Sequence, residues 1–382
     1  MNKEIYLDSA ATTRPSDGVL EFTAAAARDC YANPDSMHAL GLEAERRVER
    51  AREIIAASLG AARGEIIFTS SGTEANNLAV FGAAEALKRR GSKIITTDSE
   101  HASVYMPMRE LEKRGFEIIY LSAKGGCIDM GELKAKLDDK VVLISVMLVN
   151  NETGSIFDAG ALAGAVENAG LRSSLYIHCD AVQAYGKMPV DVNKLKIDMM
   201  SVSAHKIHGP KGAGALFLRK GVRIAPLLFG GGQENGLRAS TLNTAGILAF
   251  GKAAEEINKN DGHITELYDY AVAKIKEKCP EVIFNQQANF IKYIMSLRLP
   301  GIKSEVIVNY LSGQGIYVSS GAACSGKRKK TREANRVLLG FGLSEAEAES
   351  TIRASFSKYN TFEEIEIFAE KLAAGIKKYK NN

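Results

Sequence analysis

Two lysines lie five residues apart in the segment SVSAHKIHGPKGAGALFL, residues 201–218. Lys206 directly follows a run of apolar and small residues that predicts a strand, so its amine should lie at the end of that strand. A lysine that is partly buried beside other polar groups can act as an amine nucleophile or as a base. Lys211 lies between proline and glycine in a predicted turn, where an exposed charge is the simpler interpretation.

Polar side chains also follow the ends of other predicted strands. In the motif SSGTEANN, Gly72 and Thr73 begin a predicted helix and could bind an anion, although a purely structural helix cap is the alternative. Asp180 ends an apolar strand, where it could pair with a protonated ring nitrogen or cap the next helix; Gln183 follows close by. His101 could stack on a planar ligand or move a proton, or it could be an ordinary loop histidine.

These groups together match the requirements of pyridoxal 5′-phosphate. This cofactor needs a turn that binds its phosphate, a carboxylate for its ring nitrogen, a residue that stacks on the ring, and a lysine that forms a Schiff base. In open α/β sheets ligands bind beyond the carboxyl ends of the strands, so the groups should meet at that edge. Lys206 is therefore the predicted reactive lysine, and Lys211 is assigned no chemistry.

The elements that must position these groups alternate between strands and helices. Strands are predicted at 65–69, 93–97, 116–121, 141–149, 174–179, 197–203 and 213–218. Helices are predicted at 43–58, 74–90, 103–114 and 158–169. This alternation indicates an α/β fold whose large domain has a mostly parallel, seven-stranded sheet that is covered by helices.

The remaining residues predict a smaller α+β domain. Helices are expected at 245–259, 264–278, 304–312, 344–350 and 361–378, and strands at 291–299, 315–318 and 351–356. The predicted large domain spans residues 15–255. The predicted small domain combines residues 1–14 with residues 256–382.

Composition excludes several other classes of protein. The net charge of +4 is small for 382 residues and gives no reason to expect direct nucleic-acid binding. No apolar run is long enough for a membrane span, and the start shows no secretion signal, so a cytoplasmic location is expected. The five scattered cysteines predict free thiols, with neither a disulfide framework nor a metal site.

Several motifs follow one another in an order and spacing that resemble a known family. They are YLDSAATT, NPDSMH, FTSSGTEANNLA, EHASV, VNNETG, HCDAVQAYGK, SVSAHKIHGPKGAGAL, GGGQENGLRASTLN, SSGAACS and IRASFSKYNT. Over nearly its whole length the chain resembles the cysteine desulfurases, which belong to the class V aminotransferase group of fold-type I pyridoxal-phosphate enzymes.

The resemblance implies a role for each matching residue. Lys206 would carry the cofactor, with Asp180 at the ring nitrogen, Gln183 at the ring hydroxyl and His101 stacked on the ring. The cofactor's remaining contacts would come from Gly72, Thr73, Ser203, His205, Asn151 and, from the second subunit of a homodimer, Thr241.

The resemblance also implies the substrate and the product. Asn151 and Arg353 would hold L-cysteine, with Arg353 binding its carboxylate as a fork of donors. Lys206 would remove the α-proton, and Cys324 would attack the substrate sulfur as a thiolate. The products would be L-alanine and a persulfide on Cys324, whose sulfur passes to a protein acceptor such as an iron–sulfur scaffold or a thiolation relay.

The sequence after Cys324 departs from the family pattern. The family has a short polar loop and a turn that contains proline, whereas this chain has Lys327–Lys330 followed by Arg332. A solvated loop is one interpretation of this basic stretch. The alternative hypothesis is that it docks an acidic sulfur acceptor or favours the Cys324 thiolate.

Three other functions stay open at this stage. An aminotransferase of the same fold would use Lys206 without Cys324, and a selenocysteine lyase would use the same residues as a desulfurase. A non-catalytic scaffold for iron–sulfur assembly would need none of them, so the presence of Lys206, Asp180 and Cys324 argues against it.

Overall fold

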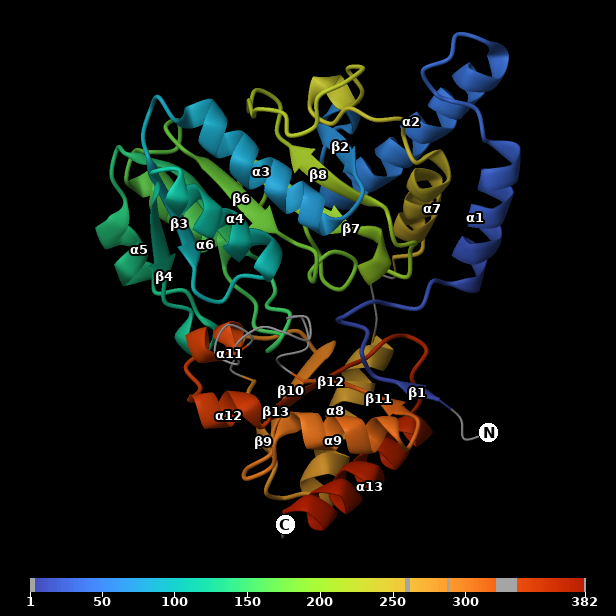
Figure 1. Ribbon diagram of the computed structural model, residues 1–382, viewed down its shortest axis with the longest axis vertical. Helices are drawn as coiled ribbons and strands as arrows, with labels where there is room; N and C mark the ends of the chain where they lie inside the picture. Colours follow the sequence, from blue (N-terminus) through green and yellow to red (C-terminus); the bar gives the residue numbers. More distant parts are fainter. Residues whose placement is uncertain (1–3, 258–261, 287–288, 321–334, 381–382) are drawn as a thin grey trace.

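The computed structural model describes residues 4–257, 262–286, 289–320 and 335–380. Figure 1 shows a large sheet wrapped by helices above a smaller sheet with its own helices. The predicted residues Cys324, Lys327–Lys330 and Arg332 lie outside the described residues.

The large sheet has seven strands, and six of them run parallel. In chain order they are β2 (Ile66–Thr69), β3 (Lys93–Thr97), β4 (Glu117–Leu121), β5 (Val141–Met147), β6 (Tyr176–Asp180), β7 (Met199–Ser203) and β8 (Gly214–Leu218). Their order across the sheet is β2-β8-β7-β6-β5-β3-β4, and β8 alone runs antiparallel to its neighbours. This topology confirms the predicted α/β fold with a mostly parallel, seven-stranded sheet.

Helices bury both faces of this sheet. They are α1 (Asp17–Asp29), α2 (Ala39–Leu59), α3 (Gly72–Leu87), α4 (Ala102–Lys113), α5 (Met130–Lys136), α6 (Ala159–Asn168) and α7 (Thr244–Glu255). In β3, Ile94 packs with residues of α3 and α4, whereas Ile95 packs with residues of α2, α6 and α7. Successive side chains of a strand point to opposite faces, so a sheet covered on both sides buries whole strands. All seven residues of β5 are buried accordingly.

The smaller sheet is antiparallel and lies in the C-terminal part of the chain. Its order is β12 (Ser319–Ser320), β13 (Thr351–Ser355), β10 (Ile294–Arg298) and β9 (Ile283–Phe284). Strand β1 (Ile5–Tyr6) pairs in parallel with β11 (Ile316–Tyr317) beside it. The helices here are α8 (Gly262–Lys278), α9 (Ser304–Ser312), α11 (Arg336–Gly340), α12 (Glu345–Glu349) and α13 (Phe362–Tyr379).

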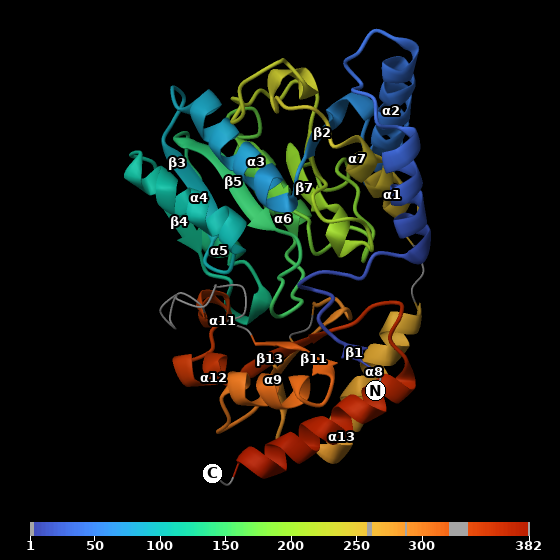
Figure 2. The same cartoon turned by 45° about the vertical axis from the view of Figure 1, so that its right-hand side comes forward.

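The two sheets have separate hydrophobic cores. Leu7, Leu297 and Phe368 belong to the core of the smaller sheet, which also takes in residues of α8, α9 and α13. We call residues 15–255 the large-sheet region, and we call the described residues of 4–14 and 256–380 the small-sheet region. The division into domains at these residues stays a prediction, which the separate cores support. Figure 2 shows β1 beside β11 in the small-sheet region, with the chain then rising to α1.

The predicted strand at 141–149 is too long. Strand β5 ends at Met147, because the chain turns sharply at residues 150–155. The side chain of Asn150 accepts hydrogen bonds from the backbone N–H groups of Glu152 and Thr153, at 2.9 and 3.0 Å. An asparagine that bonds to the backbone two residues ahead stabilises a turn in place of a strand. Helices α1, α5 and α11 are present in the structure but were not predicted from the sequence.

Two of the predicted absences can be compared with the structure. Within the described ranges, no helix combines the length and the apolar character that a bilayer crossing requires. The same ranges contain no group of three or more metal-ligating side chains, and the four cysteines that they include are free thiols.

A buried ion pair fastens α2 to the edge of the large sheet. The guanidinium group of Arg52 donates two hydrogen bonds to the carboxylate of Glu234, at 2.7 and 2.8 Å. The Glu234 side chain is 1% exposed and also accepts a hydrogen bond from the backbone of Phe68 in β2. Glu49 lies 2.9 Å from Arg52 as a second, more exposed partner.

We expect Glu234→Ala to lower the stability of the protein by about 3 kcal/mol. Breaking a buried ion pair costs about 3–5 kcal/mol, and the low end applies because Glu49 still faces Arg52. Glu53→Ala is the matched control, since it removes exposed ion pairs with Arg50 and Arg63 that are worth about 0–1 kcal/mol each. Thermal unfolding followed by circular dichroism measures both changes. Equal shifts in Tm would contradict a stabilising role for the buried pair.

Candidate active site

A cavity of about 270 Å³ lies at the carboxyl ends of the parallel strands. Most of the residues predicted from the sequence line it: Gly72, Thr73, His101, Asn151, Asp180, Gln183, His205, Lys206 and Arg353. The lining also includes residues without a predicted role, namely Ala10, Ala11, Ser71, Asn76, Ser103, Met147, Val149 and Val182. The structure therefore brings the predicted groups to one edge of the large sheet.

Lys206 lies in a single turn of 3₁₀-helix, Ala204–Lys206, which directly follows β7. Its ammonium group donates hydrogen bonds to the backbone carbonyls of Ala10 and Ala11, at 2.5 and 2.8 Å. The N-terminal segment thus holds the amine inside the cavity. Lys211 is exposed on the following turn, as the sequence predicts.

A chain of buried hydrogen bonds links Asp180 to His101. The amide nitrogen of Asn76 in α3 donates to Asp180 Oδ2 at 2.7 Å and to Ser103 Oγ at 2.8 Å. Ser103 Oγ lies 2.7 Å from Nδ1 of His101, and the Ser103 backbone N–H donates to the same nitrogen. Because Nδ1 is the acceptor, the ring proton of neutral His101 is on Nε2. Burial lowers the pKa of His101, which favours this neutral form.

The part of the cavity at the start of α3 fits an anion. Helix α3 begins there at Gly72, where the first backbone N–H groups have no acceptor within the helix. A Cβ atom on Gly72 would lie 2.6 Å from a methyl group of Val182 and 3.5 Å from Cβ of Ser203, so a side chain there would fill the cradle. Ser203 Oγ is buried without a hydrogen-bond partner among the described residues. Burial lowers the pKa of His205 to about 4.

Gln183 is fixed by contacts on both ends of its amide. Its nitrogen donates to the carbonyl of Ala10 at 2.8 Å, and its oxygen accepts a hydrogen bond from Lys187 Nζ at 2.8 Å. Burial lowers the pKa of Lys187 well below its usual range, and the charge of Lys206 lowers it further. Lys187 was not among the predicted site residues, although it lies in the same motif as Gln183.

Arg353 reaches the cavity from the small-sheet region. It lies in β13 and is only 2% exposed. Its guanidinium group donates to the carbonyl of Asn151 at 2.9 Å and to Asp8 Oδ1 at 3.0 Å, and it lies 3.4 Å from Glu152 Oε1. Asp8 and Glu152 occur in the quoted motifs, but no role was predicted for either.

Three predicted residues are not in this lining. Ser203 lies next to Gly72, which does line the cavity. Thr241 is exposed and lies away from the cavity of its own chain, so the predicted contact across a dimer is not tested. Cys324 is outside the described residues.

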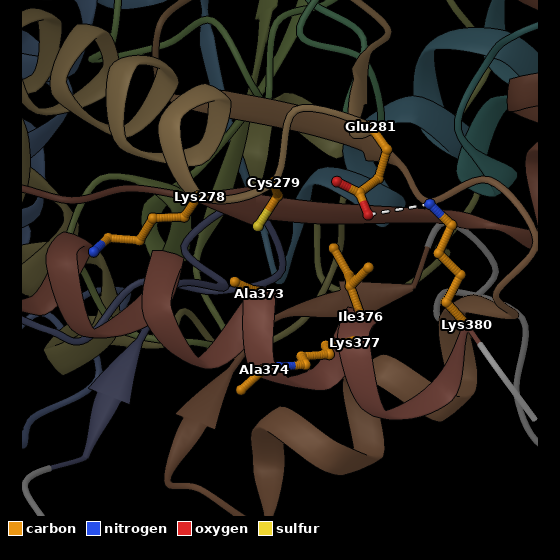
Figure 3. A pocket seen from close by; sticks show the side chains of 8 residues that line it. All are labelled: Lys278, Cys279, Glu281, Ala373, Ala374, Ile376, Lys377 and Lys380. Carbon is orange, nitrogen blue, oxygen red and sulfur yellow. Dashed lines mark hydrogen bonds and ion pairs between the residues drawn. The ribbon is translucent and has the colours of Figure 1, made fainter.

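A second hollow, of about 400 Å³, lies between α8 and α13, and Figure 3 shows the residues around it. Three of the charged side chains that line it are paired: Lys380 lies 3.2 Å from Glu281, and Lys278 lies 3.1 Å from Glu366. Burial raises the pKa of the Cys279 thiol to about 11, so this thiol is not a reactive nucleophile. We therefore assign the chemistry to the first cavity.

The observed residues fit pyridoxal 5′-phosphate. The glycine cradle and the unpartnered Ser203 hydroxyl suit its phosphate, and the buried carboxylate of Asp180 suits a protonated ring nitrogen. The buried Oδ1 of Asn151, which has no hydrogen-bond partner among the described residues, leaves a further polar atom for a ligand. The fold and the cavity define a pyridoxal-phosphate enzyme of fold type I.

Comparisons with known proteins identify the family. The family model described as aminotransferase class-V matches residues 5–368, so the chain belongs to the class V aminotransferase family. It is 40% identical over 371 residues to a protein of Dictyoglomus turgidum named cysteine desulfurase IscS, covering 96% of this chain and 92% of that one. The match confirms the predicted family and its cofactor, pyridoxal 5′-phosphate.

Solved structures agree with this assignment. A structure titled NifS-like protein matches with a TM-score of 0.90 at 36% identity, covering 97% of this chain and 99% of that one. A structure titled SspA in complex with cysteine matches with a TM-score of 0.79 at 32% identity, covering 94% of this chain and all of the other. The similarity therefore extends to both sheets.

We expect Asn76→Leu to weaken cofactor binding about ten- to hundredfold. The variant keeps the size of the side chain but removes the donor to Asp180 and Ser103, and a hydrogen bond to a charged group is worth about 1.5–3 kcal/mol. Titration of the apoenzyme with pyridoxal 5′-phosphate, followed by absorbance, measures the Kd.

Asn77→Ala is the matched control, because the neighbouring Asn77 bonds only to the backbone of residues 73 and 103. Its Kd should change less than threefold, since its loss removes only bonds between neutral groups. Equal losses in both variants would indicate a general effect on α3.

Proposed function

We propose that this chain removes sulfur from L-cysteine, giving L-alanine and a persulfide on Cys324. One observation carries the proposal. Lys206 and Arg353 line the same cavity, in a chain that matches cysteine desulfurases over almost its whole length. This arrangement provides an amine for the α-carbon and a guanidinium group for the carboxylate of an amino acid.

The residues around the cavity would hold the cofactor as follows. Gly72, Thr73, Ser203 and His205 would bind the phosphate, and Asp180 would keep the ring nitrogen protonated. Gln183 would contact the ring hydroxyl, Asn151 would make a further contact to the cofactor, and His101 would stack on the ring. When bound, pyridoxal 5′-phosphate withdraws electrons from the α-carbon of the substrate.

The side chains of this protein then perform the proton and sulfur transfers. Arg353 binds the substrate carboxylate, and Asn151 helps to orient the substrate. Lys206 Nζ accepts the α-proton, while the neutral His101 carries a proton on Nε2 that it can donate. The Cys324 thiolate forms a bond to the substrate sulfur as the carbon–sulfur bond breaks. The electron pair of the broken bond stays with the carbon, which is protonated to give alanine.

The protein is proposed to act as a homodimer in the cytoplasm. Large apolar side chains are exposed on α1, near the start of α2 and at residues 227–229, which favours a protein contact there. They are Leu20, Phe22, Tyr31, Met37, Leu40, Leu42, Leu227, Leu228 and Phe229. In such a dimer the exposed Thr241 of one subunit would complete the phosphate site of the other.

The persulfide is proposed to pass its sulfur to a protein acceptor, either an iron–sulfur scaffold or a thiolation relay. The basic stretch at Lys327–Lys330 would dock an acidic surface of this acceptor. Charge reversal within this stretch should then slow sulfur transfer to the acceptor more than persulfide formation.

We expect Cys324→Ser to abolish sulfide release from L-cysteine, because the substrate sulfur then has no thiolate to receive it. Lys206→Ala should abolish alanine formation as well, since no amine remains to take the α-proton. Sulfide and alanine are measured together with L-cysteine and a reductant.

Lys211→Ala is the matched control and should keep full activity, because Lys211 is exposed and does not line the cavity. If Cys324→Ser retained sulfide release at the wild-type rate, the protein would not be a desulfurase of this type. Keto-acid formation in place of alanine would identify an aminotransferase.

A further inference from the structure

The guanidinium group of Arg353 is held by two carboxyl groups that come from distant parts of the chain. Nη2 donates to Asp8 Oδ1 at 3.0 Å, and Nη1 lies 3.4 Å from Glu152 Oε1. Ser319 donates to the same oxygen of Asp8 at 2.8 Å, and Asn151 donates to the same oxygen of Glu152 at 2.9 Å. We call Asp8, Glu152 and Arg353 the acid–arginine triad.

The triad is buried unevenly. The side chains of Arg353 and Glu152 are 2% and 4% exposed, whereas that of Asp8 is 20% exposed. The second carboxyl oxygen of Glu152 is buried and has no hydrogen-bond partner among the described residues. A buried carboxylate without full hydrogen bonding is costly, so Glu152 is the member of the triad that most readily takes up a proton.

The charges around Glu152 make its protonation depend on the ligand. The groups that face it are Arg353 from β13, Asp8 from the segment after β1, Lys206 from the turn after β7, and its neighbour Asn151. With both acids ionised, the triad carries one positive and two negative charges. A substrate carboxylate would add a third negative charge beside one guanidinium group, and like charges at such distances disfavour ionisation.

We propose that Glu152 takes up a proton when a substrate carboxylate binds to Arg353, so that Glu152 is a positioning residue that couples substrate binding to pH. This inference rests on the role of Arg353 in the proposed function. Neutral Glu152 still accepts the hydrogen bonds of Arg353 and Asn151 through Oε1, so the geometry of the fork is kept in both protonation states.

The coupling acts in the neutral pH range. Burial raises the pKa of Glu152 to about 7, with Arg353 lowering it and Asp8 raising it. A bound carboxylate raises this pKa further. Below about pH 7 the group is already neutral in the free protein, and carboxylate affinity is independent of pH. Above this pH the Kd rises by up to about tenfold per pH unit, because each binding event takes up one proton.

Propanoate is a suitable probe, because it carries the carboxylate but has neither an amine nor a thiol. It is titrated into the holoenzyme by calorimetry between pH 6 and 9, in buffers that differ in their heat of ionisation. We expect the wild type to take up a fraction of a proton that approaches one above about pH 7, while its Kd rises by about tenfold per pH unit.

Two variants isolate Glu152. In Glu152→Gln the Kd should be independent of pH and the proton uptake should vanish, because the amide keeps the acceptor but cannot titrate. Glu100→Gln is the matched control. Burial also raises the pKa of Glu100, to about 8, but Glu100 bonds to Thr97 and the backbone of Met147 rather than to Arg353. This control should keep the wild-type proton uptake.

The outcomes distinguish the proton coupling at Glu152 from the proposed desulfurase function. A wild-type Kd that is independent of pH, or equal proton uptake in Glu152→Gln, would overturn the coupling and leave the desulfurase assignment intact. In another outcome, propanoate binding depends on pH and is lost in Arg353→Ala, while the wild type releases no sulfide. This combination would support the coupling and refute the desulfurase function. Absence of propanoate binding to the wild type counts against both the role of Arg353 and the coupling. A wild-type Kd that is independent of pH overturns the coupling even if a variant does not fold.

Discussion

Residues 8–13 hold the active site together, because their polar groups meet the reactive side chains from both regions. The carbonyls of Ala10 and Ala11 accept hydrogen bonds from Lys206 at the end of the large sheet. The N–H group of Ala10 donates to Ser355 Oγ in the small sheet, and Asp8 contacts Arg353. Buried backbone groups must be paired, so these hydrogen bonds fix the position of this segment against the large-sheet region. The lysine and the arginine are thereby placed around one cavity.

The charge of the site is controlled mainly by burial. Burial favours the neutral forms of His101 and His205, whereas the guanidinium group of Arg353 is always charged and is surrounded by two acids and a carbonyl. Neutral histidines leave the cavity free of extra positive charge at the positions where a cofactor ring and its phosphate would bind. Arg353 and Lys206 are then the cations that can attract an amino acid by its carboxylate and react with it, respectively.

The sequence predicts the sheet and its polar edge because both follow from local patterns. Continuous apolar runs predict strands that are buried on both faces, and Lys206 and Asp180 follow directly from their position at strand ends. The contacts among Asp8, Glu152 and Arg353 could not be predicted in this way. Asp8 and Arg353 are 345 residues apart in the chain, and pairing of side chains over such separations depends on tertiary packing.

Asn76 and Ser103 illustrate the same limit on a smaller scale. Each is an ordinary polar residue in the first turns of a helix, where a capping or solvated role is the usual interpretation. Their function becomes visible only when α3 and α4 pack on the same face of the sheet and Asn76 reaches both Ser103 and Asp180. The expected strand at 141–149 fails for a related reason, since the turn bonds of Asn150 outweigh the apolar pattern.

The division of the site between the two regions has a physical consequence for catalysis. Lys206 and Asp180 belong to the large-sheet region, whereas Arg353 and Asp8 belong to the small-sheet region. Effective catalysis requires the reacting groups to be held near their productive geometry, and a displacement of about 1 Å can cost about a hundredfold in rate. A buried arginine with partners in both regions resists such displacement, because any shift would expose or unpair a charge. Glu152 lies in the loop after β5 and contacts Arg353. It therefore helps to fix the distance between the two regions, and its protonation changes the charge beside the substrate carboxylate.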